Sequence, residues 1–374
     1  MIVKKACRRS TEQITGAPSS ESSPAEEVIA NNVDILTEIL LRVRAKSLIR
    51  FKSVSKHWFS LISSSQFSTT HSRRNPKPSI SGWFFSWKSI PLYHPIYNPI
   101  PQTITHSCNG LLLYEFAYLT PPVYMVCNPT TGKYALIPKP IEFSSGPKLL
   151  RLWGSSYLAF DPSKSPRYKV AFVGFYPGIL NIHIYIYCSE SASWKQILAP
   201  GTRRGHTAIC GGVIHWLNDD NIVVGFDVYS EKMIKMPNAP KMLCDFYIRY
   251  FGGCGGRLIL ILDRNPDEVE FKILEMDKDY GSWTMECEFH LRDVMSALQP
   301  IAPYSGKKFS ILSVVEEEEE KGYSLILALP GKVVSYNLQL KTWNVLRDAA
   351  PGESICDLHP YATAHPYIES LSPV

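Results

Sequence analysis

Residues 33–63 carry more apolar side chains than a segment of this size can bury on its own. Apolar residues recur at helical spacing in its first part, at Ile35, Leu36, Ile39, Leu40 and Val43. The pattern continues at Leu48, Phe51, Val54, Trp58, Leu61 and Ile62. A domain of about 40 residues rarely supplies a self-sufficient core. We therefore expect a run of short helices, part of whose apolar surface meets another protein.

The positive charge of the chain is concentrated in the same region. The net charge is +5, and residues 31–74 hold eight Lys and Arg side chains against Asp34 and Glu38. The rest of the chain is close to neutral, so its composition does not indicate a nucleic-acid-binding domain. A basic helical segment would attract an acidic partner. A solvated face that keeps an apolar segment in solution would have the same composition.

The cysteines and the hydropathy indicate a soluble protein of a reducing compartment. None of the nine cysteines has C-x-x-C spacing, and most lie in apolar runs, as expected of buried free thiols. The first residues lack the apolar core of a signal peptide. The uncharged stretch 170–189 has the length of a membrane span, but Pro177-Gly178 interrupts it. We expect a protein of the cytoplasm, the nucleus or both that binds no membrane.

The chain divides by pattern into four parts: a flexible tail (1–30), a helical module (31–74), a polar linker (75–79) and a β-rich domain (80–374). The β-rich domain holds short apolar runs separated by turn residues. We expect strands at 80–87, 111–118, 123–127, 168–175, 182–188, 213–217, 222–228, 258–262, 269–276, 324–329 and 333–338. A short helix is expected at 291–298. This pattern predicts an all-β domain, a sandwich, a barrel or a propeller.

Five degenerate repeats favour the propeller. Each consists of a strand, a polar turn and a second strand, and four of the five carry Trp or Tyr in that second strand or at its start. The repeats lie at 127–138, 187–197, 226–237, 274–283 and 336–346. Copies fall roughly 40–60 residues apart, the period expected of propeller blades. We read each as the outer hairpin of a blade and expect about six blades.

The helical module resembles an F-box, which docks substrate receptors onto the Skp-type adaptor of a cullin ubiquitin ligase. The resemblance rests on Asp34, Glu38-Ile39-Leu40, Arg42, Lys46-Ser47-Leu48, Arg50-Phe51, Val54-Ser55-Lys56, Trp58 and Leu61-Ile62-Ser63. It implies that the adaptor is bound by Asp34, Ile35, Leu36, Glu38, Ile39, Leu40, Leu48, Phe51, Val54 and Trp58. The family usually opens with Leu-Pro, where this chain has Asn31-Asn32, and has a second Pro at the position of Arg44. Replacing the opening Leu-Pro by two amides removes apolar surface worth on the order of 1–3 kcal/mol of contact with the adaptor.

The β-rich domain resembles the F-box-associated, kelch-like domain of plant F-box proteins. The most recognisable motifs are His106-Ser-Cys-Asn-Gly-Leu-Leu-Leu113 and Cys127-Asn-Pro-Thr-Thr-Gly132. Weaker matches are Phe160-Asp161 with Tyr168-Lys169-Val170, Gly212-Val-Ile-His-Trp-Leu217 and His365-Pro-Tyr-Ile-Glu-Ser-Leu371. The resemblance implies a small all-α F-box module followed by a kelch-like β-propeller.

Residue types that often catalyse reactions or bind ligands have structural explanations in this chain. The ten histidines show no metal-ligand spacing, and those in strand contexts are expected to be structural. The glycine run 252–256 lacks the helix and the Lys-Ser/Thr of a phosphate loop, and it is expected to be a turn with positive φ angles, like Asn109-Gly110 and Gly211-Gly212. The acidic run 316–320 is expected to be a solvated loop tip, with a docking site for a basic substrate as the alternative.

The sequence thus predicts a substrate-recognition subunit of a Skp–cullin–F-box ubiquitin ligase, with no catalytic residues, metal or cofactor of its own. Its partners would be the adaptor, cullin through the adaptor, and a protein substrate that the sequence does not name. Two other interpretations stay open. The chain could be an F-box protein acting outside a ligase, or a β-propeller enzyme with a helical extension.

Overall fold

The computed structural model describes residues 32–75, 79–87, 103–116, 123–138, 153–175, 181–200, 205–218, 221–240, 246–264, 270–298, 309–317, 322–350 and 362–374. The expected tail 1–30, residues 76–78 of the expected linker and residues 318–320 of the acidic run lie outside them. The chain forms two compact units, residues 1–43 and 44–374, which are described separately. The limits expected for the helical module and the linker stay predictions from sequence.

The first unit contains one described helix, α2 (Val33–Leu40). It begins at Asn32, whose Oδ1 accepts hydrogen bonds from the backbone N–H groups of Asp34 and Ile35, each at 3.1 Å. Asn is among the best N-cap residues, and the Asp34 carboxylate in the first turn adds favourable charge there. Asn32, which replaces the proline usual in the family, therefore starts this helix as a cap.

Three more helices open the second unit: α3 (Ala45–Phe51), α4 (Lys56–Ser63) and α5 (Ser65–Arg74). Serines start the last two of them. Ser55 Oγ accepts from the N–H of Trp58, and Ser64 Oγ accepts from the N–H of Phe67, both at 3.1 Å. These caps split a continuous apolar pattern into short helices rather than one long one.

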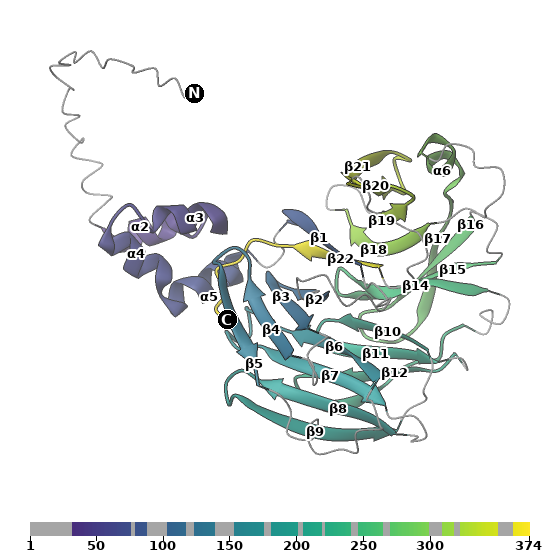
Figure 1. Ribbon diagram of the computed structural model, residues 1–374, viewed down its shortest axis with the longest axis horizontal. Helices are drawn as coiled ribbons and strands as arrows, with labels where there is room; N and C mark the ends of the chain where they lie inside the picture. Colours follow the sequence, from purple (N-terminus) through teal and green to yellow (C-terminus); the bar gives the residue numbers. More distant parts are fainter. Residues whose placement is uncertain are drawn as a thin grey trace, which may run out of the picture. The chain divides into compact units, whose positions relative to one another are not determined.

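The remainder of the unit is built from four-stranded antiparallel sheets whose strands are neighbours in sequence, as in propeller blades (Figure 1). The first blade holds β2 (Thr103–Cys108), β3 (Leu111–Phe116), β4 (Val123–Asn128) and β5 (Lys133–Ile137). The second holds β6 (Trp153–Ala159), β7 (Lys169–Phe175), β8 (Asn181–Cys188) and β9 (Ser193–Pro200). The third holds β10 (Gly205–Cys210), β11 (Val213–Asn218), β12 (Val223–Asp227) and β13 (Lys232–Lys235).

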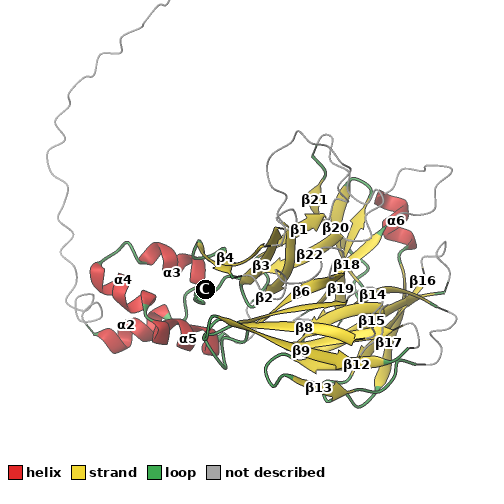
Figure 2. Ribbon diagram, turned by 60° about the horizontal axis from the view of Figure 1, so that its bottom comes forward, coloured by secondary structure: helices red, strands yellow, loops and turns green. Residues whose placement is uncertain are grey.

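The fourth blade holds β14 (Tyr247–Cys254), β15 (Arg257–Asp263), β16 (Glu270–Met276) and β17 (Trp283–His290). The fifth holds β18 (Ser310–Glu316), β19 (Tyr323–Leu329), β20 (Lys332–Asn337) and β21 (Trp343–Asp348). A short helix, α6 (Arg292–Leu298), lies between these two blades in sequence, which confirms the helix expected at 291–298. A separate two-stranded sheet pairs β1 (Gly82–Trp87) with β22 (Ala362–Tyr367), so it joins the two ends of the propeller (Figure 2). The described residues thus hold five four-stranded blades, and the expected count of about six depends on this last sheet.

The five sequence repeats are the outer hairpins of the five blades, as expected. They correspond to the pairs β4–β5, β8–β9, β12–β13, β16–β17 and β20–β21. The inner hairpins confirm the expected turns at Asn109-Gly110 and Gly211-Gly212, where both residues have positive φ. Of the glycine run 252–256, only Gly255 and Gly256 form such a turn, and residues 252–254 belong to β14. Two-residue turns with two positive φ angles match the twist of paired strands, which explains the glycines.

The core lies between neighbouring blades. Leu113 and Val126 of the first blade pack with Leu158 and Tyr185 of the second, and all four are at most 1% exposed. Equivalent apolar layers lie between the second and third, third and fourth, and fourth and fifth blades. These layers hold the blades together and leave the outermost strands exposed.

Candidate functional site

Helix α2 presents two apolar stripes, and only one of them is covered. Leu36 and Leu40 are 2% and 1% exposed, whereas Ile35 and Ile39 are 42% and 47% exposed. The two isoleucines are four residues apart and therefore lie on the same face of the helix. The predicted acidic residues Asp34 and Glu38 are also exposed. Covering an isoleucine side chain fully yields roughly 1.5–3 kcal/mol, so this face can bind an apolar surface.

Helices α3 and α4 show the same division between covered and uncovered residues. Leu48 is fully buried, and Phe51 and Trp58 are half-buried, with their rings edge to face and their centroids 5.7 Å apart. Val54, in the turn between the two helices, is 61% exposed. Next to Trp58, Phe59 is 56% exposed, and the Lys52 ammonium lies 5.9 Å from the centre of its ring.

The predicted adaptor contacts therefore fall into two groups. Seven of the ten lie at least partly on the surface: Asp34, Ile35, Glu38, Ile39, Phe51, Val54 and Trp58. The other three, Leu36, Leu40 and Leu48, are buried and cannot meet a partner directly in this conformation. The burial of Leu48 indicates a structural role within the second unit, and Leu36 and Leu40 form the covered stripe of α2.

Sequence reasoning missed two exposed apolar residues, Val33 and Phe59. Val33 is 46% exposed. The signal for Phe59 was present, because residues 58–62 contain Trp58, Phe59, Leu61 and Ile62, more apolar side chains than one buried helical stripe can use.

The charged side chains of α3–α5 themselves are all basic. Residues 44–75 contain seven Lys and Arg residues and no Asp or Glu, and Lys46, Arg50 and Lys56 are exposed. Partial burial, together with the nearby Lys133 ammonium, lowers the pKa of Lys52. An acidic surface placed here would relieve this repulsion and would be attracted before contact.

Two described histidines of the propeller, His106 and His215, have structural roles. His106 accepts a hydrogen bond at Nδ1 from the N–H of Leu158 in the next blade, and burial, with His365 nearby, lowers its pKa to about 3. Burial also lowers the pKa of the fully buried His215 to about 4, and its Nε2 lies 3.3 Å from Tyr280 Oη. Both stay neutral at physiological pH. Within the described residues no three His, Cys, Asp or Glu side chains are placed to hold a metal ion.

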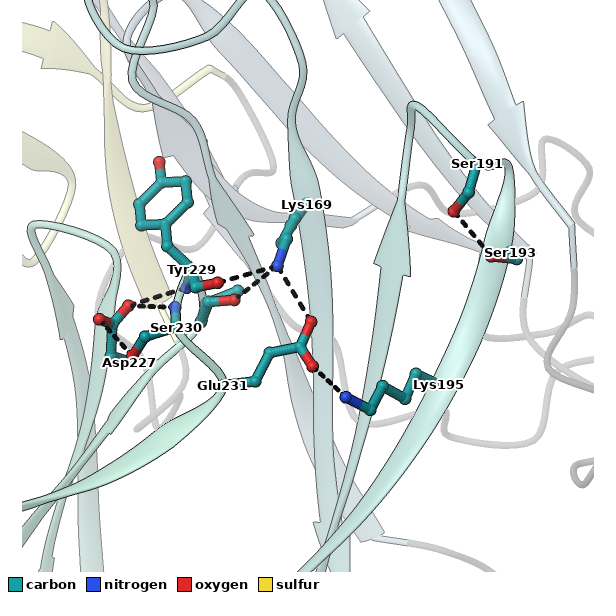
Figure 3. A network of polar contacts seen from close by, with 9 residues as sticks. Lys169, Ser191, Ser193, Lys195, Asp227, Tyr229, Ser230 and Glu231 are labelled. Carbon is teal, nitrogen blue, oxygen red and sulfur yellow. Dashed lines mark hydrogen bonds and ion pairs between the residues drawn. The ribbon is translucent and has the colours of Figure 1, made fainter.

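One polar network in the propeller resembles a site but is a link between blades (Figure 3). Lys169 Nζ of the second blade donates to Val228 O, Tyr229 O and Glu231 Oε1 of the third, at 3.1, 3.2 and 3.1 Å. Lys195 pairs with the other oxygen of Glu231. The ammonium of Lys169 uses its three donors within the protein, so the network fastens the second and third blades to each other.

Comparison with known proteins agrees with this arrangement of helices and blades. No described helix is both long and apolar enough to cross a bilayer. Residues 47–302 match the family described as F-box associated beta propeller domain. The chain is 27% identical to F-box protein At5g07610 of Arabidopsis thaliana over 380 residues, covering 87% of this chain and 88% of that protein. It is 30% identical to F-box protein At5g65850 of the same plant over 257 residues, covering 60% of this chain and 59% of that protein.

Among solved structures, prolyl oligopeptidase B from Galerina marginata aligns with a TM-score of 0.36 and 10% identity, covering 64% of this chain and 32% of that one. A similarity this low supports no argument about function.

Proposed function

This chain belongs to the F-box proteins with an F-box-associated β-propeller domain, and from this premise we propose that it is the substrate-recognition subunit of a Skp–cullin–F-box ubiquitin ligase. In this role it directs the ubiquitination and degradation of a target protein. The observation that carries the proposal is the exposed Ile35–Ile39 pair, an apolar surface on a short helix that has no described cover. Exposed apolar patches of this kind are typical of protein interaction sites.

The Skp-type adaptor would cover the exposed apolar residues of the helices. In α2 these are Ile35 and Ile39, flanked by Asp34 and Glu38. In the second unit they are Val54, the exposed edges of Phe51 and Trp58, and Phe59. The acid-free stretch 44–75 would orient an acidic adaptor during the encounter. Cullin would join through the adaptor and make no contact of its own with this chain.

The propeller would hold the substrate, and the chemistry would take place on partner enzymes. Five blades joined by apolar layers form a rigid support, and the loops between their strands can vary without disturbing it. A receptor of this kind needs no catalytic residue or cofactor. Both the cytoplasm and the nucleus are suitable compartments for it.

The test is capture of the ligase by the purified full chain. A tagged chain is mixed with a Skp-type adaptor and cullin, and wild type is compared with an Ile35→Glu/Ile39→Glu variant. The control is Leu340→Glu, which alters an exposed apolar residue of the fifth blade. We expect wild type and control to retain the adaptor, and cullin only when the adaptor is present. If the α2 variant retains as much adaptor as wild type, the proposed contact is wrong. If wild type retains no adaptor, the receptor role is wrong.

A second role, as an F-box protein outside a ligase, is favoured by one observation. Asn32 stands where the family has an apolar residue, and its side chain is used in capping α2. This reduces the apolar surface offered to the adaptor. Reconstituted ubiquitin transfer to a partner captured by the propeller separates the two roles, because a chain acting outside the ligase would hold the partner without modifying it.

We also propose that β1 and β22 are the inner strands of a sixth blade. Ala364 of β22 packs with Leu312 and Ile326 of the fifth blade. On the other side, Ser107 Oγ of the first blade donates to Pro366 O of β22 at 2.6 Å. A sheet in contact with both the fifth and the first blade would close the ring by pairing the two ends of the domain. Deletion of residues 362–374 should then destabilise all the blades together. If the deletion removes only the β1–β22 sheet and leaves the blades as stable as before, the sheet does not close the ring.

A further inference from the structure

The two most recognisable motifs of the propeller and one of the weaker ones meet at residues 368–374, an arrangement that the receptor role alone does not explain. We call residues 368–374 the C-terminal segment. Its Ser370, Leu371 and Ser372 are at most 8% exposed, and Val374 packs against the apolar layer between the first and second blades. Two motifs belong to the first blade, and the third runs from β22 into the segment itself.

Asn128, at the end of β4, holds the backbone of the segment. Asn128 is fully buried, and its Nδ2 donates to Ser370 O at 3.0 Å and to Ser372 O at 2.8 Å. Its Oδ1 accepts from the N–H of Thr130 at 2.9 Å and so caps the β4–β5 turn. The side-chain amide of Asn128 therefore has two roles: its oxygen caps the turn, and its nitrogen binds the backbone of the segment.

Neighbouring residues of the first blade fit the same segment. Thr130 Oγ1 accepts from the N–H of Ser370 at 3.1 Å and lies 3.1 Å from Tyr367 Oη. Gly110 has φ +85°, and a Cβ on it would lie 2.3 Å from Ser370 Cβ. The inner turn must therefore be glycine both for its backbone angle and for the approach of the segment.

The other side of the segment holds the helices. Glu369 Oε2 accepts a hydrogen bond from the N–H of Lys46 at 3.1 Å, in the first turn of α3. The N-cap residue of that helix, Arg44, makes no side-chain cap. The Glu369 carboxylate, 323 positions from Lys46, accepts a hydrogen bond from the first turn in its place. In α5, the buried Ser68 donates from its Oγ to Leu371 O at 2.9 Å.

We propose that the C-terminal segment is a joint that fixes α3–α5 on the first blade, with Asn128 as its central positioning residue. If the chain has the proposed function, the joint sets the position of an adaptor bound to these helices relative to a substrate bound to the propeller. The motifs containing Gly110, Asn128 and Glu369 are accordingly parts of the joint and not of a substrate-binding loop.

The other blades show which part of Asn128 serves the joint. Asn337 Oδ1 caps the equivalent turn of the fifth blade through the N–H groups of Gln339 and Leu340. In the third blade Asp227 Oδ1 does the same for Tyr229. An aspartate therefore suffices for the turn, and the substitution Asn128→Asp removes the donors to the segment while keeping the cap. Asn337→Asp is the matched control.

The experiment is hydrogen exchange of backbone amides in the full-length free chain, read by mass spectrometry. In Asn128→Asp we expect exchange in α3 and α5 to become about tenfold faster or more, as expected when local opening becomes easier. The third and fourth blades should keep wild-type rates, and Asn337→Asp should change only its own turn. Wild-type rates in α3 and α5 of Asn128→Asp, with the segment itself released, would overturn the proposal.

Milder variants and the complex complete the test. If Asn128→Asp fails to fold, Glu369→Gln, which weakens the cap on α3 without touching the blade, should still accelerate exchange at 45–48, and unchanged rates there would count against the joint. In complex with the adaptor, Asn128→Asp should retain the adaptor as wild type does but give a broader distance distribution in small-angle scattering. If the adaptor binds neither wild type nor any variant, the proposed function is wrong. The hydrogen-exchange measurement on the free chain still tests the joint in that case.

Discussion

The hydroxyl of Tyr323 in the fifth blade donates a hydrogen bond to Glu275 Oε2 in the fourth at 2.5 Å, and Glu275 is 7% exposed. The other carboxylate oxygen lies 2.7 Å from Nη1 of Arg257. Burial, followed by the Glu275 carboxylate, raises the pKa of Tyr323. A carboxylate held by a cation and a hydroxyl thus fastens the fourth and fifth blades.

The first prediction concerns this buried carboxylate. Glu275→Ala should lower the free energy of unfolding by about 3 kcal/mol, because it leaves the Arg257 and Tyr323 groups without their acceptor. Tyr323→Phe removes one charge-assisted hydrogen bond and should cost less, about 1.5 kcal/mol. Urea unfolding followed by tryptophan fluorescence measures both. A smaller loss for Glu275→Ala than for Tyr323→Phe would contradict the reading of Glu275 as the centre of the link.

The second prediction is a loss of stability in acid through His215. Burial lowers its pKa from an ordinary 6.5 to about 4, so between these values the unfolded chain binds the proton that the folded chain excludes. Stability therefore falls as the pH drops from about 6.5 to 4, by an amount on the order of 3 kcal/mol for this group. His215→Gln should flatten that slope in urea unfolding at pH 7, 6, 5 and 4. His290→Gln, at a half-exposed histidine, is the control, and an unchanged slope in His215→Gln would count against the prediction.

The third prediction separates residues that hold the helices from residues that bind. Leu48→Ala should destabilise the chain by about 2–5 kcal/mol, because Leu48 is fully buried. Ile39→Ala should change stability by less than about 0.5 kcal/mol and weaken adaptor binding roughly tenfold or more. Thermal unfolding and adaptor binding, measured on the same samples, give the comparison. If both variants lose adaptor affinity in the same proportion to their loss of stability, then Ile39 acts only through folding.

The fourth prediction is that charge governs the rate of adaptor association. Arg50→Glu/Lys56→Glu reverses two exposed charges in a stretch without acidic residues. We expect the association rate of an acidic adaptor to fall about tenfold at low salt, with less change in dissociation. The difference should shrink at 0.5 M NaCl because exposed charges are screened. Lys232→Glu/Lys235→Glu, on an exposed strand of the third blade, is the control, and an equal effect there would show that only net charge matters.

Sequence reasoning found the outer hairpins of the blades because their turns are local. Asn128, Asp227 and Asn337 each cap a turn within three residues of themselves, so the signal lies in neighbouring letters. The innermost strand of each blade was missing from the expected strands, namely β2, β6, β10, β14 and β18. The sequences of β2, β6 and β10 are rich in Ser, Thr, His and Gly, as in Thr103–Cys108, and lack the apolar alternation that marks a strand with one covered face.

The candidate site could be located from sequence, but its exposed face could not. Ile35 and Leu36 are neighbours of similar hydrophobicity, and helical spacing alone does not tell which stripe is covered. The joint could not be predicted from sequence for a different reason. Lys46 and Glu369 meet only because the chain returns to its helices after completing the propeller, and no local pattern records a contact over 323 positions.

The most direct test of the central claim is the affinity of the purified full-length chain for a Skp-type adaptor, measured by surface biosensor at physiological salt. We expect saturable one-to-one binding with a Kd of about 1 μM or tighter, equivalent to about −8 kcal/mol. Ile35→Glu/Ile39→Glu should abolish that binding while leaving the unfolding temperature unchanged. Absence of binding by the wild-type chain at about fifty times that concentration would contradict the account.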